Sequence, residues 1–183
     1  MRTVLILALT LSLGACKDEA ALPDPVVMTD EALGHYCQMY LSDHTGPKAQ
    51  AFLDGYHQPV WFSQVSDAAA YRDDREKPAP IAVIYVSDMG AAESWAVAGP
   101  ANWISAETAS YVIDSRQTGG MGLPEAIPFG RLPDAEAFAA KHGGRVVAWA
   151  DIPPGYGQIV PGDGPIRPPE TLVGQETDGE FGE

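Results

Sequence analysis

The fold is decided by a stretch that occurs twice, as Val60-Trp61-Phe62-Ser63-Gln64-Val65-Ser66-Asp67-Ala68-Ala69-Ala70-Tyr71 and, without gaps, as Ile127-Pro128-Phe129-Gly130-Arg131-Leu132-Pro133-Asp134-Ala135-Glu136-Ala137-Phe138. Four aligned positions are identical and three more are similar. Each copy begins with apolar and aromatic residues typical of a short strand and continues into a helical pattern. A strongly apolar strand follows each copy, at residues 81–86 and 145–149. The repeat indicates two similar structural units.

Extended runs precede both copies and complete the predicted units. Residues 49–53 precede the first copy, and residues 109–114 precede the second. We also predict a strand over residues 34–41 that pairs with residues 49–53 as a hairpin. The resulting fold class is α+β, with two ββαβ units, antiparallel or mixed sheets and one short helix in each unit. We expect the two units to span residues 34–92 and 93–159.

A cysteine and a methionine lie two residues apart in the predicted strand over residues 34–41. Side chains i and i+2 of a strand point to the same face, so the Cys37 thiol and the Met39 thioether would be neighbours. Cu(I) prefers such soft sulfur ligands and also accepts imidazole. The pair therefore predicts a Cu(I) site that needs one more donor. The candidate donors are methionines in glycine-flanked turns or histidines close in sequence to Cys37, namely Met89, Met121, His35 and His44.

The second unit offers a comparison for this pair. If the strand at residues 109–114 is the counterpart of the strand that carries Cys37 and Met39, then Tyr111 and Ile113 replace the two sulfur ligands. A unit that keeps the scaffold without the sulfur atoms indicates that the pair serves a site and not the fold. Zinc is disfavoured because thioether is a poor zinc ligand. Calcium is disfavoured because the acidic residues lack the spacing of a calcium loop.

The N-terminus resembles a bacterial lipoprotein signal. Met1-Arg2 precedes an apolar stretch that is too short to span a bilayer. Leu13-Gly14-Ala15-Cys16 then resembles a lipobox, which predicts a signal peptide over residues 1–15 and a lipid anchor on Cys16. An ordinary secretory signal is the alternative. Residues 16–33, which are polar and contain prolines, are predicted to tether the domain to the lipid.

The residue after the predicted anchor suggests an address. Lys17 resembles the sorting signal of lipoproteins that are sent to the outer membrane. We therefore expect the protein on the periplasmic side of the outer membrane, held there through Cys16. Contact with the membrane is expected through this lipid anchor only, because docking on anionic lipids needs a basic surface and the chain carries a formal net charge of −14. The same charge argues against nucleic acid as a partner.

Lipidation of Cys16 would leave Cys37 without a partner in the chain, because the sequence contains two cysteines. Unpaired thiols are uncommon in the oxidising periplasm. Three interpretations of Cys37 remain open: a buried inert thiol, a nucleophile and a metal ligand. The neighbouring methionine and histidines favour the metal ligand, so we do not expect an enzyme. A Cys37-dependent thiol enzyme or lyase and a structural lipoprotein are the alternatives. Residues 160–183, rich in proline, glycine and acids, are predicted to be disordered.

Several short motifs, taken in order, closely resemble the NosL family, the copper-chaperone lipoproteins of the nitrous oxide reductase system. The resemblance runs from about residue 34 to residue 152. The motifs that carry it are Tyr36-Cys37-Gln38-Met39, His44-Thr45-Gly46-Pro47-Lys48-Ala49-Gln50, Trp61-Phe62-Ser63, Ile84-Tyr85-Val86-Ser87-Asp88-Met89-Gly90, Ala109-Ser110-Tyr111-Val112-Ile113, Gly119-Gly120-Met121-Gly122-Leu123-Pro124-Glu125-Ala126 and His142-Gly143-Gly144.

The resemblance implies a fold, a function and a set of ligands. The implied fold consists of two ββαβ units like those of the organomercurial lyase superfamily. The implied function is delivery of Cu(I) for the maturation of nitrous oxide reductase, with that reductase and its copper-site maturation proteins as partners. The Cys-x-Met motif maps onto Cys37 and Met39, and we take Met89, in its Asp-Met-Gly turn, as the third ligand. The alternative third ligands are His44, Met121 and His35.

Overall fold

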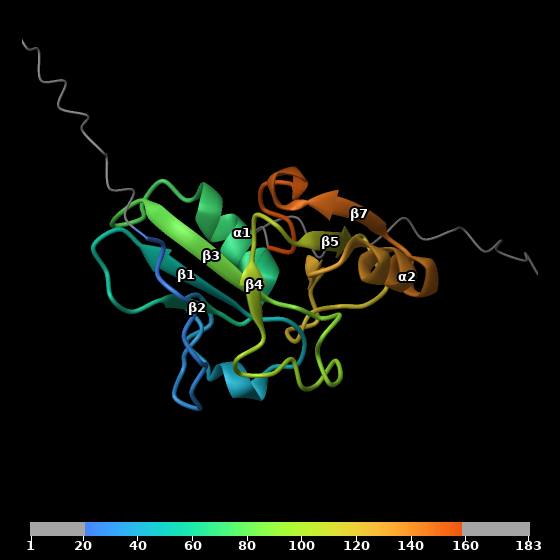
Figure 1. Cartoon of the computed structure of the whole chain (residues 1–183), viewed down its shortest axis with the longest axis horizontal. Helices are drawn as coiled ribbons and strands as arrows, with labels where there is room; N and C mark the ends of the chain where they lie inside the picture. The colour runs from blue at the N-terminus through green and yellow to red at the C-terminus, as the bar shows by residue number, and fades with distance from the viewer. Residues whose placement is uncertain (1–20, 159–183) are drawn as a thin grey trace, which may run out of the picture.

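Two antiparallel sheets, each accompanied by one helix, make up the described part of the chain (Figure 1). The computed structural model describes residues 21–158. The predicted signal peptide, the predicted lipidation site Cys16 and the predicted tail at residues 160–183 lie outside the described residues. Among the helices of residues 21–158, none has the length and apolarity needed to cross a membrane.

The first sheet has the strand order β2-β1-β3-β4, and neighbouring strands are antiparallel. Its elements are β1 (Ala49–Leu53), β2 (Val60–Phe62), α1 (Val65–Asp73), β3 (Ile81–Ser87) and β4 (Trp103–Ser105). Helix α1 connects β2 to β3 and packs on β1, β2 and β3. The strand β4 lies in the segment that was expected to belong to the second unit, but it pairs with β3 of the first sheet.

The second sheet has the strand order β6-β5-β7, and its pairs are also antiparallel. Its elements are β5 (Ser110–Ile113), β6 (Ile127–Phe129), α2 (Leu132–His142) and β7 (Arg145–Ala148). Helix α2 ends where Gly143 adopts a φ of 76° and donates its N–H to the carbonyl of Ala139. Glycine adopts this left-handed conformation without steric cost, so it stops the helix here. Two short 3₁₀ helices, Leu41–Asp43 and Trp149–Asp151, complete the elements.

The predicted duplication is confirmed by the register of the two sheets. Ala49 pairs with Phe62 in the first sheet, and Ser110 pairs with Phe129 in the second. Phe62 and Phe129 are aligned in the sequence repeat. Each sheet therefore repeats the order strand, strand, helix, strand, and the fold is α+β with two similar ββαβ units, as predicted. The register also shows that β5 is the counterpart of β1.

The predicted strand over residues 34–41 is wrong, and so is its hairpin with β1. Both edges of β1 are occupied, one by β2 and the other by β3, so no edge remains for another strand. The segment forms a loop that a single bridge between Leu33 and Tyr40 closes. Within the loop, Gln38 adopts a left-handed φ of 55°, which breaks the strand alternation. We call residues 33–40 the Cys37 loop.

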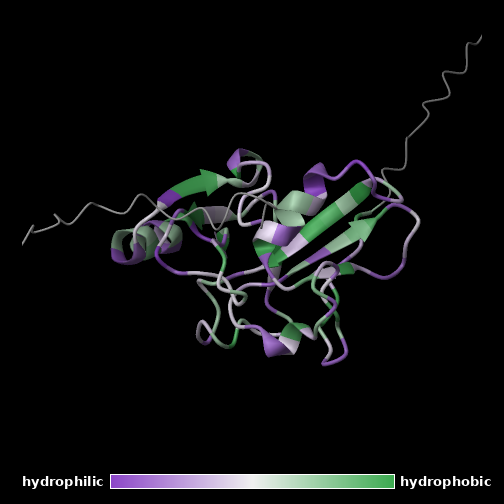
Figure 2. Cartoon of the chain, turned by 180° about the vertical axis from the view of Figure 1, so that it is seen from behind, coloured by the Kyte–Doolittle hydropathy of each residue, from purple (hydrophilic) through white to green (hydrophobic). Residues whose placement is uncertain are grey.

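Tyr111 and Ile113 are core residues and not the counterparts of Cys37 and Met39, so that prediction is also wrong. Both are fully buried and pack in the larger hydrophobic cluster, which includes the first sheet and α1. Val112 between them belongs to the smaller cluster, which includes α2 and β6. Because side chains alternate along a strand, β5 contributes to both clusters and joins the two units. The strands of both sheets are largely hydrophobic, whereas the connecting loops are of mixed hydropathy (Figure 2).

The described part of the predicted tether lies against the first sheet. The fully buried side chain of Gln50 accepts the N–H of Val26 and donates to its carbonyl, both at 3.0 Å. The Tyr85 hydroxyl donates to the carbonyl of Pro23 at 2.8 Å. The N–H of Met28 donates to the carbonyl of Pro100 at 2.8 Å. These bonds fix the course of the chain from Pro23 to Met28.

Candidate metal centre

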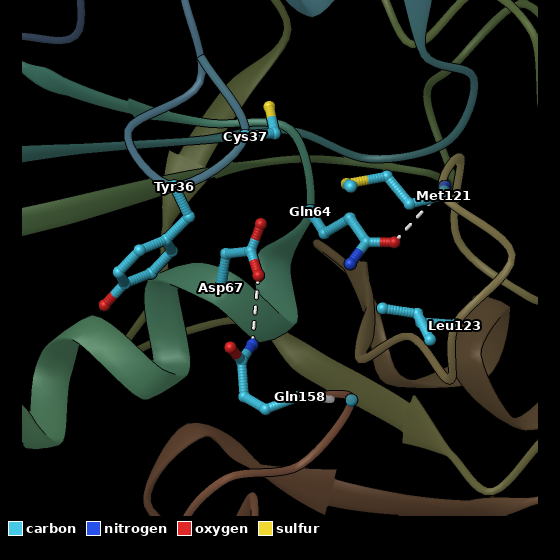
Figure 3. Close-up of a pocket in the computed structure, with 8 residues that line it drawn as sticks. Tyr36, Cys37, Gln64, Asp67, Met121, Leu123 and Gln158 are labelled. Atoms are coloured by element: carbon cyan, nitrogen blue, oxygen red, sulfur yellow. Dashed lines mark hydrogen bonds between the residues drawn. The ribbon is translucent and has the colours of Figure 1, made fainter. Parts of the chain in front are cut away.

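A cavity of about 200 Å³ lies at the junction of the two units (Figure 3). The Cys37 loop, the start of α1, the loop between β5 and β6 and the last described residues surround it. Its lining residues are Tyr36, Cys37, Gln64, Asp67, Met121, Leu123, Gly157 and Gln158. Pockets for small organic molecules usually have volumes of about 300–1,000 Å³. The cavity is therefore smaller than a typical pocket for an organic substrate.

Cys37 supplies a thiol to this cavity. The residue is half-buried, and its Sγ lies 3.1 Å from the hydroxyl oxygen of the buried Ser63. Gly34 leaves room for this contact, because a Cβ at that position would lie 2.6 Å from the Cys37 sulfur and 2.5 Å from the Ser63 oxygen. The thiol is free within the described chain. Gly34 and Ser63 thus hold the thiol of Cys37 at the cavity wall.

Met121 supplies a thioether from the other side of the cavity. A bridge between Thr118 and Pro124 closes the loop that carries it, and we call residues 118–125 the Met121 loop. A hydrogen bond of 2.8 Å from the N–H of Gly119 to the carbonyl of Leu123 tightens the turn. In Figure 3 the Met121 side chain extends from this loop toward the side of the cavity that carries Cys37. Its exposed fraction of 38% leaves the sulfur accessible to an incoming ligand.

Met89 lies elsewhere. Its N–H donates to the carbonyl of Pro128 at 2.9 Å, and its side chain packs against the smaller hydrophobic cluster. That cluster contains Val112, Ile127 and Phe129 of the second sheet. Met89 does not line the cavity that contains Cys37. The structure therefore brings Met121, and not Met89, into one cavity with Cys37.

Met39 lies on the surface of the Cys37 loop. Its exposed fraction is 42%, and its carbonyl accepts the N–H of Gly34 at 2.9 Å. Because this segment is a loop, the argument that Cys37 and Met39 share one face of a strand does not apply. Met39 is nevertheless only two residues from Cys37 in the chain, and the backbone of Gln38 between them has a left-handed conformation.

The two candidate histidines have different surroundings. The ring of His35 packs edge-on against Tyr36 and Tyr71, with centroid distances of 4.9 and 5.1 Å. His44 borders a separate cavity of about 140 Å³, which Lys48 also lines. Within residues 21–158, the buried Nε2 of His44 has no hydrogen-bond partner. A nitrogen of this kind can act as a metal ligand, so His44 keeps a place among the candidates.

Harder metal sites are not formed by the part of the chain that the structure describes. Within it, His, Cys, Asp and Glu side chains do not gather in groups of three or more that could hold an ion. The sulfur-bearing residues that line the cavity are instead Cys37 and Met121. Such a set suits a soft ion with a low coordination number.

Asp67 is a cavity residue that the sequence analysis missed. It lies in the first turn of α1, and its carboxylate accepts a hydrogen bond of 3.0 Å from the side-chain amide of Gln158. Burial raises the pKa of Asp67, while that hydrogen bond and the nearby His35 and His44 lower it. The identity of Asp67 and Asp134 in the two copies was the available signal, but it indicated a helix start and not a cavity.

Two buried ionisable residues, Glu125 at the end of the Met121 loop and Lys48, were also missed. Glu125 is fully buried, and its Oε1 accepts the N–H groups of Ser66 and Ala126, both at 2.9 Å. Its Oε2 has no partner within the described chain. Burial raises the pKa of Glu125 to about 8. Burial also lowers the pKa of Lys48 to about 8, and the Lys48 Nζ donates to the carbonyl of Gly46 at 2.7 Å.

Gly120→Ala should destabilise the protein by about 3 kcal/mol, the upper end of the usual range for an overpacked site. A Cβ at Gly120 would collide with the backbone oxygen of Thr45 and lie 3.0 Å from the Cβ of His44, so the Met121 loop would have to move. Urea unfolding measures the effect. Gly122→Ala in the same loop is the control, because a Cβ there meets open space and costs only the strain of a positive φ, about 1 kcal/mol. An equal loss in both variants would contradict the prediction.

The fold and the cavity define a duplicated α+β protein with a small cavity that one cysteine and one methionine help to line. The family model described as NosL matches residues 25–156. The chain belongs to the NosL family, as the sequence motifs indicated.

Two curated relatives carry the name "Copper-binding lipoprotein NosL". The protein from Achromobacter cycloclastes is 53% identical over 154 residues, which cover 83% of this chain and 80% of the relative. The protein from Stutzerimonas stutzeri is 30% identical over 153 residues, which cover 82% and 78% of the two chains. A crystal structure described as the copper chaperone NosL from Shewanella denitrificans matches with a TM-score of 0.66 and 27% identity, over 70% of this chain and 95% of that chain. These names describe binding proteins and not enzymes.

Proposed function

We propose that this protein is a lipid-anchored metallochaperone that binds one Cu(I) ion between the Cys37 loop and the Met121 loop and passes it to a copper enzyme. The observation that carries the proposal is that the thiol-bearing Cys37 and the thioether-bearing Met121 line one cavity of about 200 Å³. The names of the relatives, which describe copper binding and a copper chaperone, support copper as the ion.

The donor chemistry favours Cu(I) over other oxidation states and metals. Thiolate and thioether are soft ligands, and Cu(I) is a soft ion that accepts two or three of them. We take Cys37, Met39 and Met121 as the ligand set, and His44 as the alternative third donor. Met39 stays in the set because it is exposed and lies two residues from Cys37. Met89 is replaced in this proposal because its side chain packs in the second hydrophobic cluster.

Release of the ion follows from the exposure of the thioethers. Met39 and Met121 are 42% and 38% exposed, so a ligand from a partner can approach the ion before either thioether leaves. A site with three ligands can add a fourth without losing one first. Transfer then proceeds by stepwise exchange of ligands, with the Cys37 thiolate as the ligand that leaves last because it alone carries negative charge.

The place of action and the partners extend the proposal. The relatives are named as lipoproteins, which supports an anchor on Cys16 and the tether over residues 16–33. We place the protein on the periplasmic side of the outer membrane, with nitrous oxide reductase and its copper-site maturation proteins as the partners that exchange copper with it. The structural units of residues 34–92 and 93–159 are proposed to act together, because the cavity lies at their junction.

Met121→Leu should weaken Cu(I) binding about tenfold, whereas Met89→Leu should change it less than threefold. Leucine keeps the volume and the apolar character of methionine but offers no sulfur, so each variant tests a ligand and not a packing residue. The measurement is an anaerobic titration of reduced protein against a competing Cu(I) chelator, in which the unmodified protein should bind one ion. The opposite order of the two variants would return Met89 to the site and remove Met121.

A further inference from the structure

We propose that the adjacent residues Ser63 and Gln64 are positioning residues that set the spacing between the two sulfur donors. This inference rests on the proposed function, because it concerns the same Cu(I) site. Ser63 contacts Cys37, since its Oγ lies 3.1 Å from the thiol sulfur. Gln64 contacts the other donor segment, since its Oε1 accepts the N–H of Met121 at 3.4 Å. One dipeptide thus touches both segments that carry sulfur.

The Gln64 side chain is buried and closely packed at this position. It is fully buried and lines the cavity, and its Nε2 donates to the Ser66 hydroxyl at 3.4 Å. A Cβ at Gly119 would lie 2.5 Å from its Oε1 and 3.0 Å from the Oε2 of Glu125. The backbone of the Met121 loop at Gly119 therefore lies directly against the Gln64 side-chain amide. A buried, packed hydrogen-bonded group of this kind can fix the position of a ligand segment.

Helix α1 with its N-cap residue and the Met121 loop each supply a hydrogen-bond acceptor to the other. Gln64 is the N-cap residue of α1, but its side chain does not cap the helix. The N–H of Ser66, near the start of α1, donates instead to the Oε1 of Glu125 at 2.9 Å. Helix α1 thus receives its cap from the end of the Met121 loop, and the loop receives an acceptor from the N-cap residue of the helix. These two hydrogen bonds connect the two units at the cavity.

The sequence repeat supplies an internal control. The positions that correspond to Ser63 and Gln64 in the second copy are Gly130 and Arg131, and both are exposed. Arg131 is the N-cap residue of α2, and α2 forms without a buried amide there. The ββαβ fold therefore does not require a serine and a glutamine at these positions. Their presence in the first copy coincides with the sulfur donors that they contact.

The test is a double-mutant comparison of Cu(I) affinity by chelator titration. Gln64→Leu should weaken Cu(I) binding about tenfold, the lower end of what loss of a supporting residue costs a metal site. The same change made in the Met121→Leu protein should have no further effect, because Gln64 acts through Met121. X-ray absorption of the Cu(I)-loaded Gln64→Leu protein should show one sulfur ligand fewer than the unmodified protein. Arg131→Leu, at the equivalent position of the second copy, should leave affinity and sulfur number unchanged.

Ser63→Ala tests the contact between the dipeptide and Cys37. It should weaken Cu(I) binding about fivefold in the unmodified and the Met121→Leu proteins alike, because Ser63 acts through Cys37.

If Gln64→Leu does not fold, Gln64→Asn replaces it, since the shorter amide cannot reach the N–H of Met121. Unchanged affinity and sulfur number in the Gln64 variant, or an equal loss in the Met121→Leu background, would overturn the positioning role. Absence of Cu(I) binding by the unmodified protein would instead overturn the proposed function.

Discussion

Cys37→Ser should weaken Cu(I) binding at least a hundredfold. The thiolate is the one anionic ligand in the proposed set, and a serine hydroxyl is a hard and neutral donor that Cu(I) binds poorly. The change removes no large buried group, because Cys37 is only half-buried, so the fold should persist. An anaerobic titration with a competing Cu(I) chelator measures the affinity, and circular dichroism checks the fold.

The control for this prediction is Met28→Leu, since Met28 is a methionine outside the cavity that contains Cys37. It should bind Cu(I) with the affinity of the unmodified protein. A Cys37→Ser protein that binds one ion within threefold of the original affinity would show that the thiol is not a ligand. In that case the free cysteine would be an inert structural thiol, and the chaperone site would have to be sought elsewhere.

Stability should fall as the pH rises from about 4.5 to about 8, and Glu125→Gln should remove the contribution of Glu125 to this decline and leave that of the buried Asp67. Burial raises the pKa of Glu125 from 4.5 to about 8, so between these values the folded protein holds a proton that the unfolded chain has lost. Stability then decreases with pH, by about 1.4 kcal/mol per pH unit for one proton. A glutamine in the same place is neutral throughout and contributes no such slope. Urea unfolding at a series of pH values between 5 and 8 measures the effect.

Lys48 predicts the opposite slope at higher pH, which urea unfolding measures when the series is extended to about pH 10.5. Burial lowers the pKa of Lys48 from 10.5 to about 8, so above that pH the folded protein has lost a proton that the unfolded chain still holds. Stability should therefore rise again between about pH 8 and 10.5.

The control for the Glu125 prediction is Glu107→Gln, because Glu107 is exposed and its replacement should leave the pH profile of stability unchanged. A Glu125→Gln protein with the original slope between pH 5 and 8 would contradict the assignment.

Much of the fold could be predicted from the sequence because the two units repeat. The apolar runs that became β1, β3, β5 and β7 are short and continuous, and the copy at residues 127–138 supported the strand and the helix predicted within residues 60–71. The Cys37 loop could not be predicted in this way, because its aromatic and apolar residues resemble a strand. What excludes a strand there is that both edges of β1 are already occupied and that Gln38 adopts a left-handed conformation.

The sequence named Cys37, Met39 and Met89 as ligands, with Met121 as a weaker candidate. The structure places Cys37 and Met121, and not Met89, at one cavity. Met89 and Met121 both precede a glycine in a turn, and only the tertiary packing distinguishes the cavity from the second hydrophobic cluster. Gln64 was missed because its role depends on a loop that lies 57 residues further along the chain.

The most direct test of the proposed centre is a crystal structure of the Cu(I)-loaded protein, grown without oxygen, with anomalous scattering recorded at the copper absorption edge. The account predicts one strong anomalous peak in the cavity between the Cys37 and Met121 sulfur atoms, with Met39 turned toward it. A peak beside Met89, or copper bound only at surface histidines while Cys37 remains unligated, would contradict it.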